Sequence, residues 1–81
     1  MNLLTRSEIQ KFPDPLPGQV ERKIARNQPG RVKFQGTYWP AQFYYPDCQA
    51  TVLPDEPVTV VGIQGITLLV VPVNTFSQSQ S

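Results

Sequence analysis

Short runs of alternating apolar and polar residues dominate the central part of the chain, and turn-forming residues separate them. Strict alternation is typical of β-strands, and no apolar repeat of helical spacing extends far enough in this region to form a helix. The pattern predicts five strands, at residues 18–26, 30–35, 37–44, 57–63 and 66–73. The expected fold class is therefore all-β.

The second and third predicted strands form a hairpin whose register follows from its turn. A two-residue turn at Gln35-Gly36 pairs the flanking residues and fixes which side chains share a face. One face then carries the apolar side chains Val32, Phe34, Trp39 and Ala41. The other face carries Arg31, Lys33 and Tyr38. We expect Phe34 and Trp39 to lie in the core and the basic and aromatic face to lie outside.

The last two predicted strands show a conflict of register. A turn at Gln64-Gly65 places Val60 and Val70 on opposite faces, although both are typical core residues. One extra residue in a β-bulge reverses the phase of a strand, and glycine tolerates the kink. The sequence therefore predicts a bulge between Val60 and Gly62.

Both ends of the chain differ from this core region. Residues 1–17 are expected to form an N-terminal arm or linker, in which a capping pattern around Ser7 and Glu8 predicts a short helix through about Lys11. Prolines at alternate positions from 13 to 17 then favour an extended segment. Residues 18–73 form the predicted domain, and residues 74–81 a disordered polar tail.

Composition adds charge asymmetry to this picture. The chain has 81 residues and a net charge of +1, which leaves room for one domain. Its basic side chains are concentrated at Arg22, Lys23, Arg26, Arg31 and Lys33. Different faces of the domain should therefore differ in potential. A single cysteine and the lack of a long apolar run predict a cytoplasmic protein that does not insert into a membrane, although a partner could hold it at one.

The residue types that usually perform catalysis are scarce. Histidine is absent, which removes the commonest general base and most zinc sites. Cys48 has no cation beside it to stabilise a thiolate, and Asp55-Glu56 is too short for a calcium loop. We therefore expect no catalytic, metal or cofactor-binding residues, and a protein that is not an enzyme.

Three motifs resemble the soluble C-terminal domain of the NfeD family. They are GRVKFQGTYWPA at residues 30–41, PVTVVG at residues 57–62 and GITLLVVP at residues 65–72. The resemblance implies a five-stranded OB-fold barrel with Greek-key connections, here with a short N-terminal arm. It also implies a protein partner among the stomatin and flotillin-like (SPFH) membrane scaffolds.

The exposed hairpin face is the candidate binding surface. Its residues Arg31, Lys33 and Tyr38, extended by Tyr44 and Tyr45, combine charge with aromatic area, as interface hot spots do. The favoured interpretation is a protein-binding module whose partner is such a membrane scaffold or another subunit of its own complex. Single-stranded nucleic acid is the alternative ligand, because OB folds stack bases on such rings, but the small net charge argues against it. A third possibility is that the N-terminal arm covers these rings.

Overall fold

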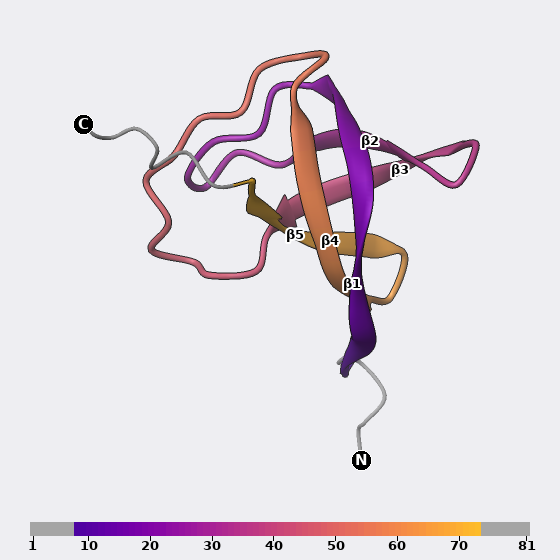
Figure 1. Ribbon diagram of the computed structural model, residues 1–81. Helices are drawn as coiled ribbons and strands as arrows, with labels where there is room; N and C mark the ends of the chain where they lie inside the picture. Colours follow the sequence, from indigo (N-terminus) through magenta and orange to yellow (C-terminus); the bar gives the residue numbers. More distant parts are fainter. Residues whose placement is uncertain (1–7, 74–81) are drawn as a thin grey trace.

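Five strands close into a barrel in the computed structural model, which describes residues 8–73 (Figure 1). The strands are β1 (Ile9–Arg22), β2 (Gly30–Phe34), β3 (Thr37–Phe43), β4 (Pro57–Gln64) and β5 (Thr67–Pro72). Their order around the barrel is β1-β2-β3-β5-β4, with β1 pairing again with β4. The described residues contain no helix. The predicted all-β, five-stranded barrel is confirmed, and its shape is consistent with an OB-fold-like barrel.

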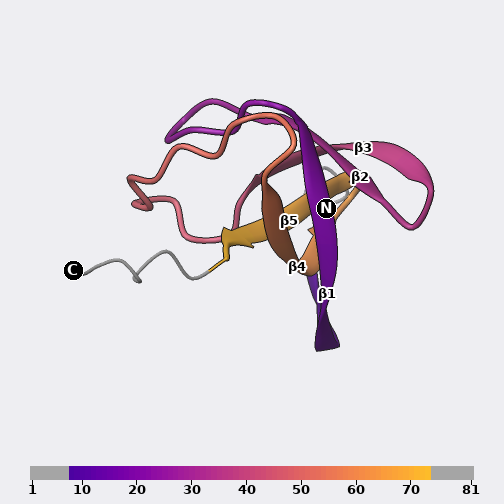
Figure 2. The same ribbon diagram turned by 45° about the horizontal axis from the view of Figure 1, so that its top comes forward.

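The strands cross at steep angles around one core, which Figure 2 shows from a second direction. Only the pair β3 and β5 runs parallel, and the other four pairs are antiparallel. Inward side chains from every strand fill the interior. Together with Ile24, which follows β1, the largest fully buried side chains are Leu68, Val20, Val32, Val58, Val60 and Val70. Branched aliphatic residues dominate this core because they pack well on a pleated surface.

The hairpin of β2 and β3 has the predicted register. Val32 is opposite Trp39 and Lys33 is opposite Tyr38, on either side of the Gln35-Gly36 turn. Phe34 is buried, as expected. Trp39 is only half-buried and packs against the edge of the core. The prediction that Trp39 lies inside the core is therefore wrong.

The hairpin of β4 and β5 contains the predicted bulge but turns one residue later than expected. Val60 is opposite Val70 and Gly62 is opposite Leu69, which leaves Val61 as the extra residue. The turn consists of Gly65-Ile66, with a φ of 63° at Gly65. A positive φ at the first turn position is typical of a type II′ turn, which requires glycine there. This preference moves the turn away from Gln64-Gly65.

The first strand is longer at its start than the sequence predicted. β1 begins at Ile9, so the helix expected through Lys11 is wrong for the described residues, and the proline-rich segment 12–17 belongs to the strand. Alternate prolines favour extended backbone, and β1 pairs with β4 on either side of residues 12–15, at residues 9–11 and 16–19. Residues 1–7, with the rest of the capping pattern, and the polar tail 74–81 lie outside the described residues.

The two long connections, residues 23–29 and 44–56, lie side by side on the left of Figure 1. β1 ends at Arg22, earlier than the predicted residue 26. Beyond it, the Ile24 N–H donates to the Val52 carbonyl at 3.0 Å, and the Val52 N–H donates back at 2.9 Å. Ile24 is completely buried although it belongs to no strand. The connections therefore form part of the core wall.

Candidate partner-binding surfaces

The outer face of β2 and β3 presents the predicted combination of cations and an aromatic ring. Tyr38 is 53% exposed, and the Lys33 Nζ atom lies 6.0 Å from the centroid of its ring. The Arg31 Nε atom lies 3.5 Å from the Glu21 Oε1 atom of β1 in an exposed ion pair. A shallow hollow of about 360 Å³ separates Arg31 and Tyr38 from the end of β1. We call Arg31, Lys33 and Tyr38 the hairpin face.

Tyr44 and Tyr45 lie on a different part of the barrel. They follow the far end of β3, and Tyr44 is six residues from Tyr38, which corresponds to about 20 Å along a strand. Their rings pack edge to face with centroids 4.9 Å apart. The Lys11 Nζ atom of β1 lies 5.2 Å from the Tyr44 ring centroid. The structure therefore divides the five predicted binding residues into two surfaces.

The N-terminal segment covers one of these rings and leaves the others exposed. Lys11 lies over Tyr44, which is half-buried, whereas Tyr38 and Tyr45 remain exposed. Phe12 turns toward the barrel and stacks on Phe34, with ring centroids 6.2 Å apart. The part of the arm that the structure describes, from residue 8 onward, therefore does not shield the whole aromatic surface.

A groove that the sequence did not predict lies beside the two tyrosines. It has a volume of about 230 Å³ and is lined by Lys11, Phe12, Pro13, Pro15, Tyr44, Tyr45, Val61 and Val71. We call it the bulge groove, because its wall and floor contain the irregular parts of β1 and β4. The predicted bulge at Val61 was the signal in the sequence that could have located it.

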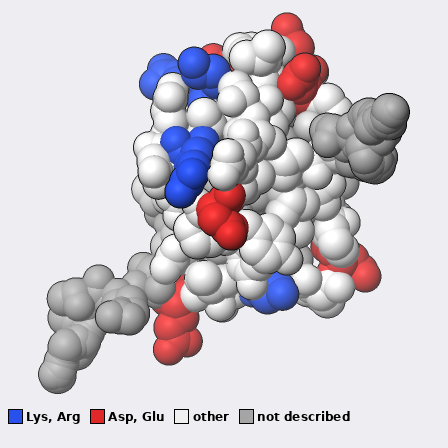
Figure 3. All heavy atoms as spheres, turned by 90° about the vertical axis from the view of Figure 1, so that its left-hand side faces the viewer, with Lys and Arg blue, Asp and Glu red and all other residues white. Residues whose placement is uncertain are grey.

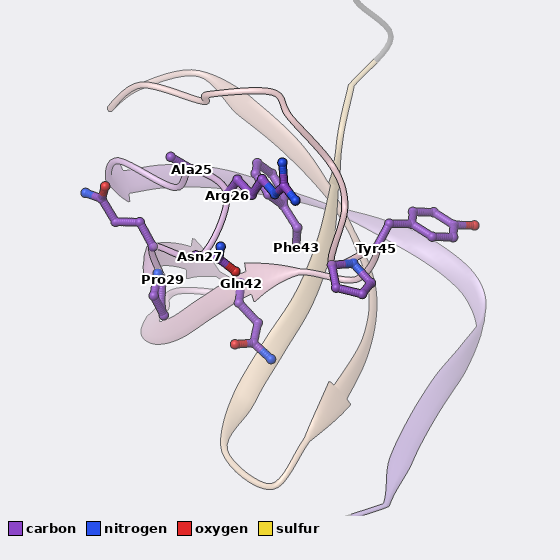
Figure 4. Close-up of a pocket in the computed structure, with 9 residues that line it drawn as sticks. Ala25, Arg26, Asn27, Pro29, Gln42, Phe43 and Tyr45 are labelled. Atoms are coloured by element: carbon purple, nitrogen blue, oxygen red, sulfur yellow. The ribbon is translucent and has the colours of Figure 1, made fainter.

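A second hollow, of about 290 Å³, separates residues 25–29 from the end of β3 (Figure 4). Its polar side chains do not converge on a common point. Figure 4 shows Gln42 and Tyr45 pointing away from each other, with Tyr45 directed toward β1. In a binding site for a small molecule, a few polar groups point toward the ligand. The polar groups of this hollow do not, so it does not resemble such a site.

Two of the remaining candidate groups, Cys48 and Glu56, make contacts within the fold. Cys48 is half-buried and packs against the core, and its N–H donates to the Tyr45 carbonyl at 3.0 Å. The Glu56 carboxylate accepts the Leu53 N–H at 3.0 Å, which closes a turn. Within residues 8–73 no group of three or more potential metal ligands occurs, and no helix is long and apolar enough to cross a membrane.

Charge is distributed unevenly over the side of the barrel that carries the long connections. Figure 3 shows Lys and Arg side chains gathered mainly in its upper left region, with another basic group at the lower edge, and acidic side chains spread over the same view. The expected difference in electrostatic potential therefore occurs between neighbouring regions of this side. The side as a whole is neither basic nor acidic.

Residues 16–72 match the family described as the NfeD-like C-terminal, partner-binding domain. The match covers all five strands except the first half of β1. No curated protein sequence and no solved structure gives a significant match to the chain.

Proposed function

Because the chain belongs to the family of NfeD-like C-terminal, partner-binding domains, we propose that it is a non-enzymatic module that binds a protein partner through its hairpin face. One observation carries this proposal. An exposed tyrosine is held beside two cations on a hairpin whose other side is anchored in the core. Tyrosine and arginine are enriched at interface hot spots because they combine large contact area with hydrogen bonding. A rigid strand pair also lowers the entropy cost of binding.

The partner that we propose is an SPFH-type membrane scaffold of the stomatin or flotillin class. The proposal rests on the family resemblance and on the binding role that the family description assigns to this domain. Such a partner would hold the domain on the cytoplasmic side of a membrane. No part of this chain would then need to enter the bilayer.

Single-stranded nucleic acid is less well supported as the ligand. OB folds bind it between the face of strands 2 and 3 and the loops that join strands 1 to 2 and 4 to 5. Here the β4–β5 connection is the two-residue turn Gly65-Ile66, which offers no wall for a strand of nucleotides. Tyr38 is the one aromatic side chain of the hairpin face. Base stacking along an oligonucleotide needs several rings.

The double substitution Lys33→Ser with Tyr38→Ser tests the hairpin face. Both side chains are exposed, so we expect the free energy of unfolding to change by about 1 kcal/mol or less, while capture of a purified SPFH scaffold protein falls at least tenfold. Surface plasmon resonance measures the capture, and thermal melting checks the fold.

A matched control removes the same types of group elsewhere. Lys23→Ser with Leu53→Ser also deletes one cation and one exposed apolar side chain, but in the long connections. This control should bind the scaffold as the unaltered protein does. Equal binding by the hairpin-face variant would place the interface elsewhere and refute the proposal.

A further inference from the structure

We propose that the bulge groove is a second binding site, which takes an extended, proline-containing peptide segment with a carboxylate beside the prolines. This inference does not depend on the hairpin face, whose Tyr38 lies about 20 Å from Tyr44 along the direction of β3. It rests on how the groove is built, on the groups that line it and on the charge of Lys11.

The groove exists because two strands are irregular at the same place. Between the pairs Lys11↔Gly62 and Leu16↔Val60, the four β1 residues 12–15 are opposite a single β4 residue, Val61. Val61 is also the extra residue in the pairing of β4 with β5. Its neighbours in the chain are buried, so the half-buried Val61 side chain points outward. Bulges that aim a side chain in this way are frequent at functional sites.

The lining is apolar and aromatic. Val61 and Val71 are half-buried and form the floor, while the exposed rings of Pro13 and Pro15 border it on β1. The Tyr44–Tyr45 pair forms the opposite wall, and Tyr45 is 57% exposed. Proline-rich segments dock in grooves of this kind, between aromatic rings, with little loss of entropy because their polyproline II conformation is preformed.

The size and the hydrogen-bonding groups of the groove favour a peptide over a small molecule. Pockets that enclose a drug-sized ligand measure about 300–1,000 Å³. A groove of about 230 Å³ instead fits a few side chains of a larger ligand. The hydroxyl groups of Tyr44 and Tyr45 make no hydrogen bond within residues 8–73. They can donate to the carbonyl groups of a polyproline II segment, which has no internal hydrogen bonds.

Lys11 defines the charge of the ligand. It is the one charged residue that lines the groove, and no carboxylate of the described chain lies within ion-pair distance of it. Its contact is the face of the Tyr44 ring. A cation at the rim of an apolar groove complements a ligand that places a carboxylate next to its apolar residues. A basic proline-rich segment would be repelled at the same position.

Nuclear magnetic resonance titration with synthetic peptides tests this site. The probe is a blocked peptide of consecutive prolines followed by two glutamates, and its matched forms carry two lysines in place of the glutamates or serines in place of the prolines. We expect saturable shifts of backbone signals at Tyr45, Val61 and Val71. The lysine form should bind about two- to fivefold more weakly, the range of an exposed ion pair, and the serine form at least tenfold more weakly.

Two matched variants separate the groove from the hairpin face. Tyr45→Ala should weaken the glutamate peptide about tenfold or more, whereas Tyr38→Ala removes an equally exposed tyrosine and should leave it unchanged. Lys11→Met should abolish the preference for glutamate over lysine. The variant that lacks Lys33 and Tyr38 should still bind the peptide even where it fails to capture a scaffold protein.

Three results would overturn the proposal. The first is that no signal shifts at millimolar glutamate peptide. The others are that the serine form binds as tightly as the glutamate form, or that Tyr38→Ala weakens binding as much as Tyr45→Ala does. Shifts at the groove that depend on protein concentration without peptide would instead make a second copy of the chain the occupant. Shifts produced by anionic lipid vesicles and not by the peptides would make a membrane surface the ligand.

Discussion

Gly62 shows how the lack of one side chain determines the shape of the surface around it. An ideal Cβ atom at this position would lie 2.5 Å from the Gln10 carbonyl oxygen and 3.2 Å from the Lys11 Cα atom. Both are backbone atoms, which cannot rotate away as a side chain can. The close approach of β1 to β4 beside the bulge groove therefore requires glycine.

The substitution Gly62→Ala should destabilise the barrel by about 1–3 kcal/mol, the usual cost of forcing extra atoms into a packed site. Urea denaturation measures the change. Ile66→Ala is the control in the same hairpin, because Ile66 is 71% exposed and should change stability by about 0.5 kcal/mol or less. Equal stability of Gly62→Ala and the unaltered protein would show that β1 does not approach β4 this closely.

At the scale of residues, the sequence predicted side chains well where a turn fixed their register. Tyr38 and Lys33 face outward together because the Gln35-Gly36 turn pairs them. Tyr44 and Tyr45 follow the end of a strand, where alternation no longer determines direction. Their position depends on β1, which is distant in sequence, and so the sequence could not place them in the bulge groove.

At the scale of elements, the two long connections contribute buried side chains and backbone hydrogen bonds to the barrel. Ile24 lies between β1 and β2 and Val52 between β3 and β4, yet both are buried and joined by two backbone hydrogen bonds. The Asp55 N–H also donates to the Val20 carbonyl at 2.7 Å, and the Val20 N–H donates to the Glu56 carbonyl at 2.9 Å. These bonds hold the long connection against the end of β1.

Ile24→Ala should therefore cost about 2–5 kcal/mol, as truncation in a strand core does, although Ile24 lies in a connection. Chemical denaturation followed by tryptophan fluorescence measures the loss. Leu53→Ala, in the other long connection but 49% exposed, should stay within about 0.5 kcal/mol. If Ile24→Ala fails to fold, Ile24→Val should still show a loss of about 0.5–1.5 kcal/mol. A loss no larger than that of Leu53→Ala would mean that the connections do not support the core.

The sequence predicted the features of strands that depend on residues close together in the chain. The β2–β3 hairpin and the bulge at Val61 were predicted because alternation and glycine positions are local. The start of β1 was missed because it depends on pairing with β4, about fifty residues away along the chain. The capping pattern favours a helix locally, and the long-range pairing overrides this preference.

At the scale of the whole molecule, charge favours a protein over nucleic acid as the proposed ligand. Seven basic and six acidic side chains give the chain a net charge of +1, and proteins that bind nucleic acid usually carry a larger basic excess. Binding to phosphates depends on the release of counterions and therefore on clustered cations. One of the cations of the hairpin face, Arg31, is already paired with Glu21.

We expect no binding of single-stranded DNA at micromolar protein and physiological salt. Fluorescence anisotropy with a labelled thymine oligonucleotide measures it, over a range of salt concentrations. Micromolar affinity that falls steeply with salt and is lost in Tyr38→Ala would reverse the ranking of ligands. A Tyr45→Ala variant serves as the control for loss of an exposed ring outside the hairpin face.

The pairing of β1 with β4 also determines how the chain reaches its native state. The residues that it joins are separated by 38 positions at Gln19 and Pro57 and by 55 positions at Ile9 and Gln64. Hairpins of neighbouring strands form in about 1–10 μs, whereas barrels dominated by distant pairings fold in about milliseconds to seconds. During synthesis, β1 leaves the ribosome first but has to wait for β4 before the barrel can close. Until then residues 9–11 and 16–18 of β1, which pair with β4 and not with β2, have no partner strand.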